Sequence, residues 1–329
     1  MLSSAAVRPR LAFAGLGWIG RDRLNALLEA DAAEIAALCD PLAEPSGELG
    51  TVVPAFEDLL SGDADAIVIA TPSAMHAAQA IAALEAGKAV FCQKPLGRNA
   101  DETRRVVDAA KANDLLLGVD LSYRFTDAMQ QVRRLVNDRT VGDVFAVDLV
   151  FHNAYGPDKP WFYDAALAGG GCVIDLGIHL VDLALWTLDF PRVEGVDAHL
   201  FHHGGHPVED YAVATFDLEG GLVARLACSW NLSAGSDCVI GATFHGTRGS
   251  AAFRNVNGSF YDFVAEHYVK TTSVQLSQPG ESWGGRAILD WLRRLSISRA
   301  FDPEIEHVVA VSEALEAVYT AASARRPRE

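Results

Sequence analysis

The first 120 residues alternate short, almost continuously apolar runs with longer segments of helical period. Apolar runs bounded by polar residues are typical of strands that are covered on both faces. Hydrophobic residues at every third or fourth position between them predict amphipathic helices. The apolar runs lie at 10–16, 34–40, 65–71, 88–93 and 115–120, and the main helical segments lie at 21–30, 75–87 and 101–113. This alternation predicts an α/β domain with a doubly wound parallel sheet.

From residue 123 the pattern changes to strands in which hydrophobic and polar residues alternate, which predicts an antiparallel sheet with one exposed face. Strands are expected near 144–152, 193–202, 209–218, 222–230 and 237–245, and helices near 125–138, 172–188 and 303–325. We therefore predict two domains, 1–122 and 123–329. The second is an α+β domain with a large open antiparallel sheet and helices on one face. We expect the last helix, 303–325, to pack back on the first domain.

Charge and composition narrow the class of protein. The 329 residues carry a net charge of -16, which disfavours nucleic acid and anionic membrane surfaces as partners. We found no uninterrupted apolar stretch of the roughly 20 residues that a membrane helix requires. The early apolar run contains three glycines and lacks a small-residue cleavage site, unlike a signal peptide. Five unpatterned cysteines are expected to be thiols, so we expect a cytoplasmic protein.

A glycine loop follows the first predicted strand and precedes a helix. Gly15, Gly17 and Gly20 have the G-x-G-x-x-G spacing, with Trp18 and Ile19 between the last two. In a Rossmann domain such glycines make the tight turn, admit a pyrophosphate and allow close packing of helix and strand. The helix N-terminus then offers N–H groups to the anion. The alternative is a tight turn that needs glycine and binds nothing.

An acidic residue follows at the distance that dinucleotide binding requires. Asp40 lies twenty residues after Gly20 and ends the second predicted strand. A carboxylate there can accept hydrogen bonds from a ribose and repels a 2′-phosphate, which favours NAD over NADP. The alternative is a turn residue before Pro41.

Polar residues also end the third and fourth predicted strands. Carboxyl ends of parallel strands border the ligand crevice, so we expect five residues to face the dinucleotide: Thr71, Pro72, His76, Gln93 and Lys94. A lysine at a strand end can reach a ligand and exchange a proton with a substrate hydroxyl. We expect Pro95 to be cis.

The long helical segment of the second domain carries a polar stripe. Asp175, His179 and Asp182 stand at i, i+4 and i+7 on one predicted helix face, and Trp186 extends it. A histidine flanked by carboxylates is a candidate acid or base. The alternative is a polar stripe satisfied at a domain interface.

Taken together, these motifs resemble the glucose-fructose oxidoreductase and inositol dehydrogenase (Gfo/Idh/MocA) family. The resemblance covers the whole chain, and its strongest anchors are Lys94-Pro95 and the segment from Asp175 to His179. It implies a nicotinamide cofactor and oxidation or reduction of a sugar, cyclitol or related hydroxyl compound. By position, Lys94 and His179 match the family's catalytic pair, and Asp175 matches its carboxylate that binds substrate or tunes the base. Asp182 matches an acid that supports the helix.

One residue departs from the family pattern. The family usually has Glu-Lys-Pro, whereas Gln93 precedes Lys94 here. Removing a negative charge beside a lysine disfavours its protonated form. The change is compatible with a better base or with a site altered for another task, and Gln93 can still hydrogen-bond a ribose hydroxyl.

Four further residues are candidates for contact with substrate. Arg124 follows the last strand of the first domain, and its alternative role is a salt bridge at a helix start. Tyr155, Trp161 and Tyr163 precede the polar helix, and aromatic rings suit the face of a sugar. Their alternative role is hydrophobic packing beneath a loop.

A histidine-rich segment invites a metal hypothesis, which we do not favour. Its members are His199, His202, His203 and His206. They lack neighbouring carboxylates and metal-site spacing, so a solvated turn is expected and no metal is predicted. Hydride transfer to a nicotinamide requires none.

These residues predict an NAD-dependent dehydrogenase that acts on CH–OH groups of a sugar-like substrate bound between the domains. Two alternatives stay open. One is an enzyme with non-exchanging NAD that performs net glycoside hydrolysis or epimerisation. The other is a cofactor-sensing binding protein without catalysis. The open sheet face predicts a homodimer or homotetramer.

Overall fold

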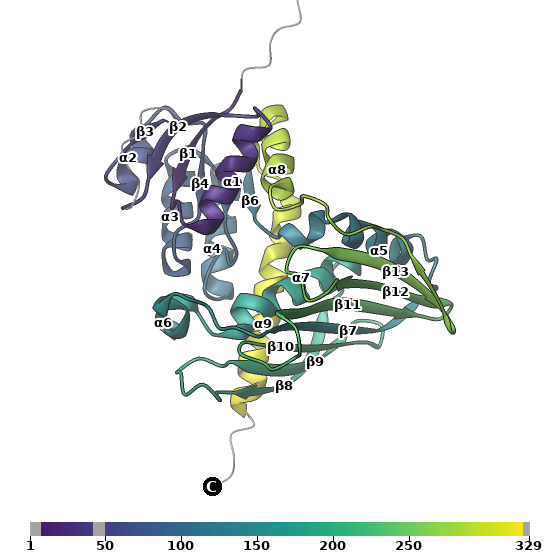
Figure 1. Ribbon diagram of the computed structural model, residues 1–329. Coiled ribbons are helices and arrows are strands. Elements are labelled where there is room, and N and C mark those ends of the chain that lie inside the picture. Colours follow the sequence, from purple (N-terminus) through teal and green to yellow (C-terminus); the bar gives the residue numbers. More distant parts are fainter. Residues whose placement is uncertain (1–7, 42–49, 325–329) are drawn as a thin grey trace, which may run out of the picture. The chain divides into compact units, whose positions relative to one another are not determined.

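The chain folds into two compact units, and each is described by itself. The structure is a computed structural model that describes residues 8–41 and 50–324 (Figure 1). Unit 1 comprises the chain up to Gly97, Asp101–Ser122 and Gly284–Glu306. Unit 2 comprises Arg98–Ala100, Tyr123–Trp283 and the chain from His307. The chain therefore leaves unit 1 and returns to it late in the sequence.

Within residues 8–41 and 50–324, unit 1 is built on a six-stranded parallel sheet with strand order β3-β2-β1-β4-β5-β6. The order changes direction beside β1, so the switch point of the sheet lies between β1 and β4, where α/β proteins bind ligands. The strands are β1 (Arg10–Ala14), β2 (Glu34–Cys39), β3 (Thr51–Val52), β4 (Ala66–Ile69), β5 (Ala89–Cys92) and β6 (Leu117–Val119). The predicted doubly wound sheet is confirmed.

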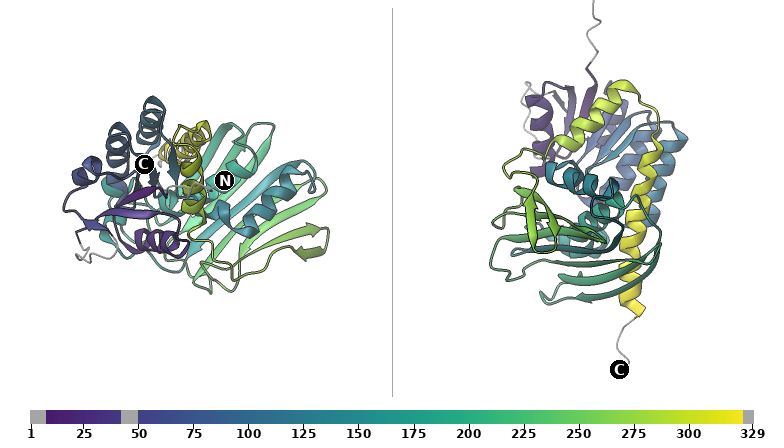
Figure 2. Two further views of the ribbon diagram at one scale, coloured as in Figure 1. Left: turned by 90° about the horizontal axis from the view of Figure 1, so that it is seen from above. Right: turned by 90° about the vertical axis from the view of Figure 1, so that its right-hand side faces the viewer.

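Helices pack around the sheet of unit 1 (Figures 1 and 2). Helix α3 packs on β4 and β5, α2 packs on β2, and α8 packs on β5 and α1. The helices are α1 (Trp18–Glu29), α2 (Phe56–Ser61), α3 (Ser73–Glu85), α4 (Ala100–Ala112) and α8 (Arg286–Ile297). The edge of the sheet that ends with β6 thus depends on a helix from the C-terminal third of the sequence.

The placement of α8 differs from the predicted boundary, which assigned all residues after 122 to the second domain. The Trp291 ring lies 5.4 Å from the ring of Phe91 on β5. A Cβ atom at Gly118 of β6 would come within 2.4 Å of Trp291. The Leu116 N–H donates to the carbonyl oxygen of Arg299 (2.7 Å). The amphipathic pattern of α8 predicts a buried face, but it does not specify which sheet that face covers.

Unit 2 is built on an eight-stranded sheet with strand order β14-β13-β12-β11-β7-β10-β9-β8. In the described chain its strand pairs are antiparallel except for β10 and β7, which run parallel. The strands are β7 (Val144–Asn153), β8 (Val193–Phe201), β9 (Tyr211–Leu218), β10 (Leu222–Ser229), β11 (Cys238–Gly246), β12 (Gly249–Asn255), β13 (Phe263–Val269) and β14 (Thr272–Gln275).

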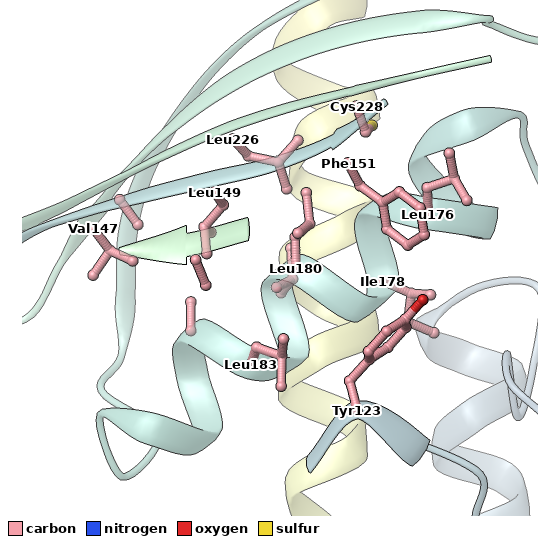
Figure 3. Packing of buried hydrophobic residues seen from close by; sticks show 14 of the residues in the cluster. Tyr123, Val147, Leu149, Phe151, Leu176, Ile178, Leu180, Leu183, Leu226 and Cys228 are labelled. Carbon is pink, nitrogen blue, oxygen red and sulfur yellow. The ribbon is translucent and has the colours of Figure 1, made fainter. Parts of the chain in front are cut away.

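Helices cover one face of this sheet (Figure 2). Helix α5 contacts β12 and β13, α7 contacts β7, β10 and β11, and α9 contacts β8. Figure 3 shows Leu149 and Phe151 of β7 in the apolar cluster with Leu180 of α7. The helices are α5 (Asp127–Asn137), the short α6 (Ala165–Ala168), α7 (Ile178–Thr187) and α9 (His307–Ala324). The predicted open sheet with helices on one face is confirmed, with one parallel pair within it.

The last helix belongs to unit 2, in contrast to the expectation that it would pack on the first domain. Helix α9 packs against β8 and α7. Its apolar side chains at Val311, Leu315 and Val318 are buried in the core of unit 2. The 3₁₀ turn Pro303–Glu306 ends unit 1, and the chain enters unit 2 at His307. The predicted single helix of 303–325 is thus divided at the boundary between the units.

One stretch of unit 2 has the length and apolar composition of a membrane-spanning helix. It comprises Ala165–Thr187, and 72% of its most apolar part is buried inside the protein. The stretch contains α6, a glycine-rich connection and α7. Because α7 packs into the core of unit 2, its apolar composition is accounted for by that packing.

Candidate active site

The glycine loop of unit 1 is shaped by close backbone approaches. Gly15 has a φ of +92°, and a Cβ atom there would lie 2.5 Å from the carbonyl oxygen of Ala70. At Gly20 a Cβ atom would lie 2.2 Å from the carbonyl oxygen of Gly15. Gly17 is the N-cap of α1 and supplies no side-chain cap. The first turn of α1 also has no acidic residue, so its N–H groups are suited to an anion.

The two residues after Gly17 differ in exposure. Trp18 begins α1 with 63% of its surface exposed, whereas Ile19 is half-buried. Both therefore lie at the helix N-terminus, as the glycine motif predicts.

Asp40 follows β2 and is tied to the glycine loop. Its Oδ2 accepts a hydrogen bond from the Leu16 N–H at 2.6 Å. The same loop is held from β2 by the Gly15 N–H, which donates to the carbonyl oxygen of Cys39 (2.9 Å). Asp40 thus stabilises the glycine loop. The sequence pattern predicted only that Asp40 binds a ribose.

The ends of β4 and β5 are joined by a buried histidine. His76 of α3 is 1% exposed. Its Nδ1 lies 2.7 Å from the carbonyl oxygen of Pro95, and its Nε2 lies 2.6 Å from that of Thr71. Burial lowers the pKa of His76, while the two carbonyl groups favour its charged form. The ring is enclosed between two turns, and this differs from the expectation that it faces a dinucleotide.

The neighbouring residues Thr71 and Pro72 form the start of α3. The Thr71 hydroxyl donates to Oε1 of Gln79 at 2.6 Å. Pro72 is the N-cap of the helix. Both residues lie after β4, at the carboxyl edge of the sheet, where the sequence predicts them.

Lys94 is the partly exposed residue in an otherwise buried stretch. Phe91–Gln93 and Pro95–Gly97 are buried, and Lys94 stands between them. The Lys94–Pro95 peptide bond is cis, as predicted. The Gln93 amide donates to Oδ2 of Asp120, which follows β6. Lys94 thus emerges from a stretch of chain whose neighbours are fixed inside unit 1.

In unit 2, Asp175 and His179 are the two partly exposed residues of a buried helical segment. Every other residue from 170 to 187 is buried. A π-helical turn, Val173–Gly177, precedes α7 and contains Asp175. Such turns alter the helix period and recur at functional sites. The segment therefore presents one carboxylate and one imidazole and buries the rest.

Aromatic side chains contact both of these residues. The Trp230 Nε1–H donates to Oδ2 of Asp175 at 3.1 Å. The Tyr123 ring meets the imidazole of His179 edge to face, with centroids 4.8 Å apart. Tyr163 packs edge to face on Trp230, at 5.6 Å. Burial and the nearby Asp175 carboxylate raise the pKa of Tyr163.

A buried carboxylate holds the N-terminal end of this helical segment. Glu209 is 2% exposed, and its Oε1 accepts from the N–H groups of Gly171 (3.0 Å) and Val173 (2.9 Å) and from the Tyr319 hydroxyl (2.8 Å). Burial raises the pKa of Glu209, and these hydrogen bonds oppose the change. A Cβ atom at Gly171 would lie 2.0 Å from the carbonyl oxygen of Glu209. The glycine-rich lead-in is thus required for this close packing.

Arg124 is engaged by protein groups. Its Nε donates to Oδ2 of Asp182 at 2.9 Å. Its guanidinium lies 5.6 Å from the ring centroids of both Trp186 and Phe190. Burial raises the pKa of Asp182 in spite of this guanidinium. Of the two roles considered for Arg124, the geometry matches the salt bridge. Asp182 supports the helix and, unlike Asp175 and His179, is buried.

The three aromatic candidates lie in different surroundings. The Tyr155 hydroxyl donates to Asp237 at 2.7 Å, and the residue is 59% exposed. Trp161 stacks on Phe162, with ring centroids 3.8 Å apart. The Tyr163 hydroxyl donates to the carbonyl oxygen of Pro157 at 3.0 Å. Of the three, Tyr163 lies nearest to the candidate site, because its ring packs on Trp230, which binds Asp175.

The four histidines of the segment 199–206 are exposed or partly exposed. His206 packs on the Tyr163 ring, with centroids 4.1 Å apart. Among residues 8–41 and 50–324, no three His, Cys, Asp or Glu side chains gather as a potential metal site.

Several residues that hold the candidate site residues in place were missed from the sequence. They are Asp120 and Arg23, whose Nε donates to that carboxylate, together with Trp230, Glu209 and Tyr319. For Asp120 a signal existed, because it follows a predicted strand just as Asp40 does and therefore had to lie at the same sheet edge. For the other four, the local pattern indicates only helix or strand positions.

A glycine loop at the switch point of a doubly wound sheet defines a dinucleotide-binding protein, and the second unit adds a partly exposed carboxylate and imidazole on one helical segment. Residues 10–121 match the family described as "Oxidoreductase family, NAD-binding Rossmann fold", and residues 129–252 match "GFO/IDH/MocA C-terminal domain". The chain belongs to the Gfo/Idh/MocA family of oxidoreductases, as the resemblance of its motifs indicated.

Curated relatives include enzymes of sugar chemistry. The chain is 28% identical over 241 residues to D-glucoside 3-dehydrogenase of Escherichia coli (strain K12), covering 66% of this chain and 69% of the relative. It is 30% identical over 247 residues to a putative UDP-kanosamine synthase oxidoreductase subunit of Amycolatopsis mediterranei (strain S699), covering 67% and 68%.

Solved structures share the fold. GenD2 from gentamicin A biosynthesis, in complex with NAD, has a TM-score of 0.82 and 25% identity, covering 98% of this chain and 97% of that chain. Levoglucosan dehydrogenase, in complex with NADH and L-sorbose, has a TM-score of 0.85 and 18% identity, covering 97% of both chains.

Proposed function

We propose that this oxidoreductase transfers a hydride between a nicotinamide cofactor and the hydroxyl or keto carbon of a sugar, cyclitol or related polyol. The observation that carries the proposal is the exposure of Asp175 and His179 alone on an otherwise buried helical segment. A buried segment that presents only an acid and an imidazole is suited to proton exchange with a bound hydroxyl.

The glycine loop fits a dinucleotide. Gly15 and Gly20 leave no room for side chains, and the N-terminus of α1 has neither a side-chain cap nor an acid in its first turn. The loop and the helix N–H groups would hold the pyrophosphate, with Thr71, Pro72 and Gln93 at the same sheet edge. When bound, the nicotinamide supplies a hydride acceptor or donor.

The chain's own residues supply the proton chemistry. We propose that Lys94 and His179 are the acid-base candidates and that one of them takes the proton of the substrate hydroxyl as the alcohol is oxidised. Asp175, itself fixed by the Trp230 N–H, orients the hydroxyl or the imidazole. Tyr163, which packs on Trp230, is the strongest of the aromatic candidates for contact with the substrate.

Asp40 supports a preference for NAD over NADP. A carboxylate at the end of the second strand attracts ribose hydroxyls and repels a 2′-phosphate. The bond from the Leu16 N–H to Oδ2 fixes the orientation of this carboxylate.

The open face of the unit 2 sheet is the proposed contact between copies of the chain. Val213 and Ala227 on this face alternate with buried core residues, and a hollow of about 350 Å³ lies over β7–β10. We propose a homodimer or homotetramer, which light scattering after gel filtration would detect. The five cysteines are thiols, which is compatible with a cytoplasmic location.

The proposal is tested by measuring NADH absorbance while the purified protein meets a panel of aldoses, ketoses, inositols and sugar acids with NAD, and separately with NADP. Reduction of NAD by one compound is the expected result. If no compound of the panel is turned over and NAD is released from the denatured protein, the result would contradict the proposal and favour a non-exchanging cofactor or a sensor.

A further inference from the structure

Four polar residues form a buried cluster beside Lys94 in unit 1. Arg23, Gln93, Asp120 and Ser122 are each at most 8% exposed. The Arg23 Nε donates to Oδ2 of Asp120 at 2.6 Å, and its Nη2 donates to the Ser122 hydroxyl at 3.0 Å. Ser122 in turn donates to Oδ1 of Asp120. The cluster joins α1 to the carboxyl ends of β5 and β6.

The hydrogen bonds that Asp120 accepts restrict which side chain can stand at position 93. Its Oδ2 accepts both the Arg23 guanidinium and the Gln93 amide. A residue at position 93 must therefore donate a hydrogen bond into a buried carboxylate. An ionised glutamate has the same size as glutamine but no donor, and it would bring a second negative charge against Asp120.

The backbone on both sides of Lys94 is tied to this part of the sheet. The Gln93 N–H donates to the carbonyl oxygen of Ile69 (2.8 Å), and the Asp120 N–H donates to that of Cys92 (2.9 Å). On the other side, the Pro95 carbonyl oxygen lies 2.7 Å from Nδ1 of His76. Together these bonds fix the residues that precede and follow Lys94.

We propose that Gln93 is a positioning residue, required as a donor by the Arg23–Asp120 pair, and that this hydrogen bond fixes the backbone from which Lys94 extends. The proposal rests on the function proposed above for Lys94. It goes further by assigning a task to the glutamine that stands before the lysine.

Gln93→Glu gives the sharpest test because its effect depends on pH. At high pH two carboxylates would face each other, whereas at lower pH the introduced carboxyl group, once protonated, could donate to Asp120 as the amide does. The charged and titratable groups around position 93 are Arg23 with its partner Asp22, Asp120, Cys92, Lys94 and, through Pro95, His76.

We expect kcat/KM of Gln93→Glu to be about tenfold or more below that of the wild type near pH 8 and within about threefold of it near pH 6. The thermal midpoint of Gln93→Glu should likewise lie below that of the wild type near pH 8 and approach it near pH 6. Because the introduced carboxyl group would have its pKa raised in the folded state, the lost stability grows as the pH rises and recovers as it falls.

Two variants serve as controls. Gln93→Met removes the donor without adding charge, so its deficit should not change with pH. Gln278→Glu adds the same charge at an exposed position and should behave as the wild type. A deficit of Gln93→Glu that is independent of pH, or the absence of any deficit, would overturn the proposal.

The thermal measurement requires no substrate, so it separates this proposal from the proposed function. If the wild type turns over no compound of the panel, the function fails while the pH-dependent midpoint still tests the cluster. If Gln93→Glu does not fold at any pH, Gln93→Met is combined with Asp120→Asn. Non-additive losses support the proposal, and additive losses refute it.

Discussion

The two units hold their candidate catalytic residues by different physical means. In unit 1, Lys94 follows a strand whose end is hydrogen-bonded, through the Gln93 amide, to a buried ion pair between Arg23 and Asp120. In unit 2, Asp175 and His179 lie on a helical segment whose first N–H groups are bound by one carboxylate, Glu209. The first arrangement pairs two opposite charges, and the second pairs a charge with neutral donors. Removing one partner should therefore cost more folding free energy in unit 1 than in unit 2.

The largest expected effect concerns the two proposed acid-base residues, one in each unit. Lys94→Ala and His179→Ala should each lower kcat by about 10² to 10⁴ if the residue removed is the acid-base group. Steady-state kinetics on the substrate found in the panel would measure this. Unchanged NAD binding in both variants would separate lost chemistry from lost cofactor. Full turnover by either variant would remove that residue from the mechanism.

The next effect tests the ion pair of unit 1. Arg23→Met leaves the Asp120 carboxylate buried without its charged partner, and such a loss costs about 3–5 kcal/mol of folding free energy. Urea unfolding would measure it. Arg105→Met removes a largely exposed arginine and should leave the free energy of unfolding nearly unchanged. A small loss for Arg23→Met would show that the pair contributes little.

A smaller effect is expected at the corresponding position of unit 2. Glu209→Gln keeps one acceptor oxygen and replaces the other by an amide NH₂ group, which cannot accept, and the expected loss is about 1–3 kcal/mol. Burial raises the pKa of Glu209, so its contribution is present at low pH and decreases as the pH rises through the folded pKa. Urea unfolding of both proteins across pH should therefore show a larger deficit in acid. The opposite trend would contradict this assignment.

The smallest effect separates positioning from packing. Trp230→Phe keeps an aromatic ring beside Tyr163 but removes the N–H that binds Asp175. The loss of one such bond, about 1 kcal/mol, corresponds to roughly a fivefold change. We expect this change in kcat with little change in the thermal midpoint. A fall in stability with normal kcat would mean that Trp230 only packs.

The sequence predicted what depends on local pattern. The glycine loop, the strand that ends at Lys94 and the polar helical segment of Asp175 and His179 were all found from spacing and periodicity. Their partners were not found, because Arg23 and Asp120 lie 97 residues apart in the chain and nothing in a helix pattern marks one arginine as buried. The same reason applies to Glu209 and Tyr319, which are 110 residues apart.

One expectation differed from the structure, and one pair of alternatives could not be decided from the sequence, for a related reason. Helix α8 has a strong apolar face, but the sequence cannot specify that this face covers β5 and not the second sheet. Arg124 follows a strand end, as a ligand contact would, yet its guanidinium pairs with Asp182. In both cases the partner lies far along the chain, and local pattern carries no information about it.

The late return of the chain to unit 1 has a consequence for synthesis on the ribosome. Arg299 binds Asp65, 234 residues earlier, and Trp291 covers Phe91 and Gly118. Until these residues leave the exit tunnel, the nascent dinucleotide-binding sheet has an uncovered apolar edge. A fragment that stops before α8 would expose this surface and need a chaperone to remain soluble, although it contains every strand of the sheet.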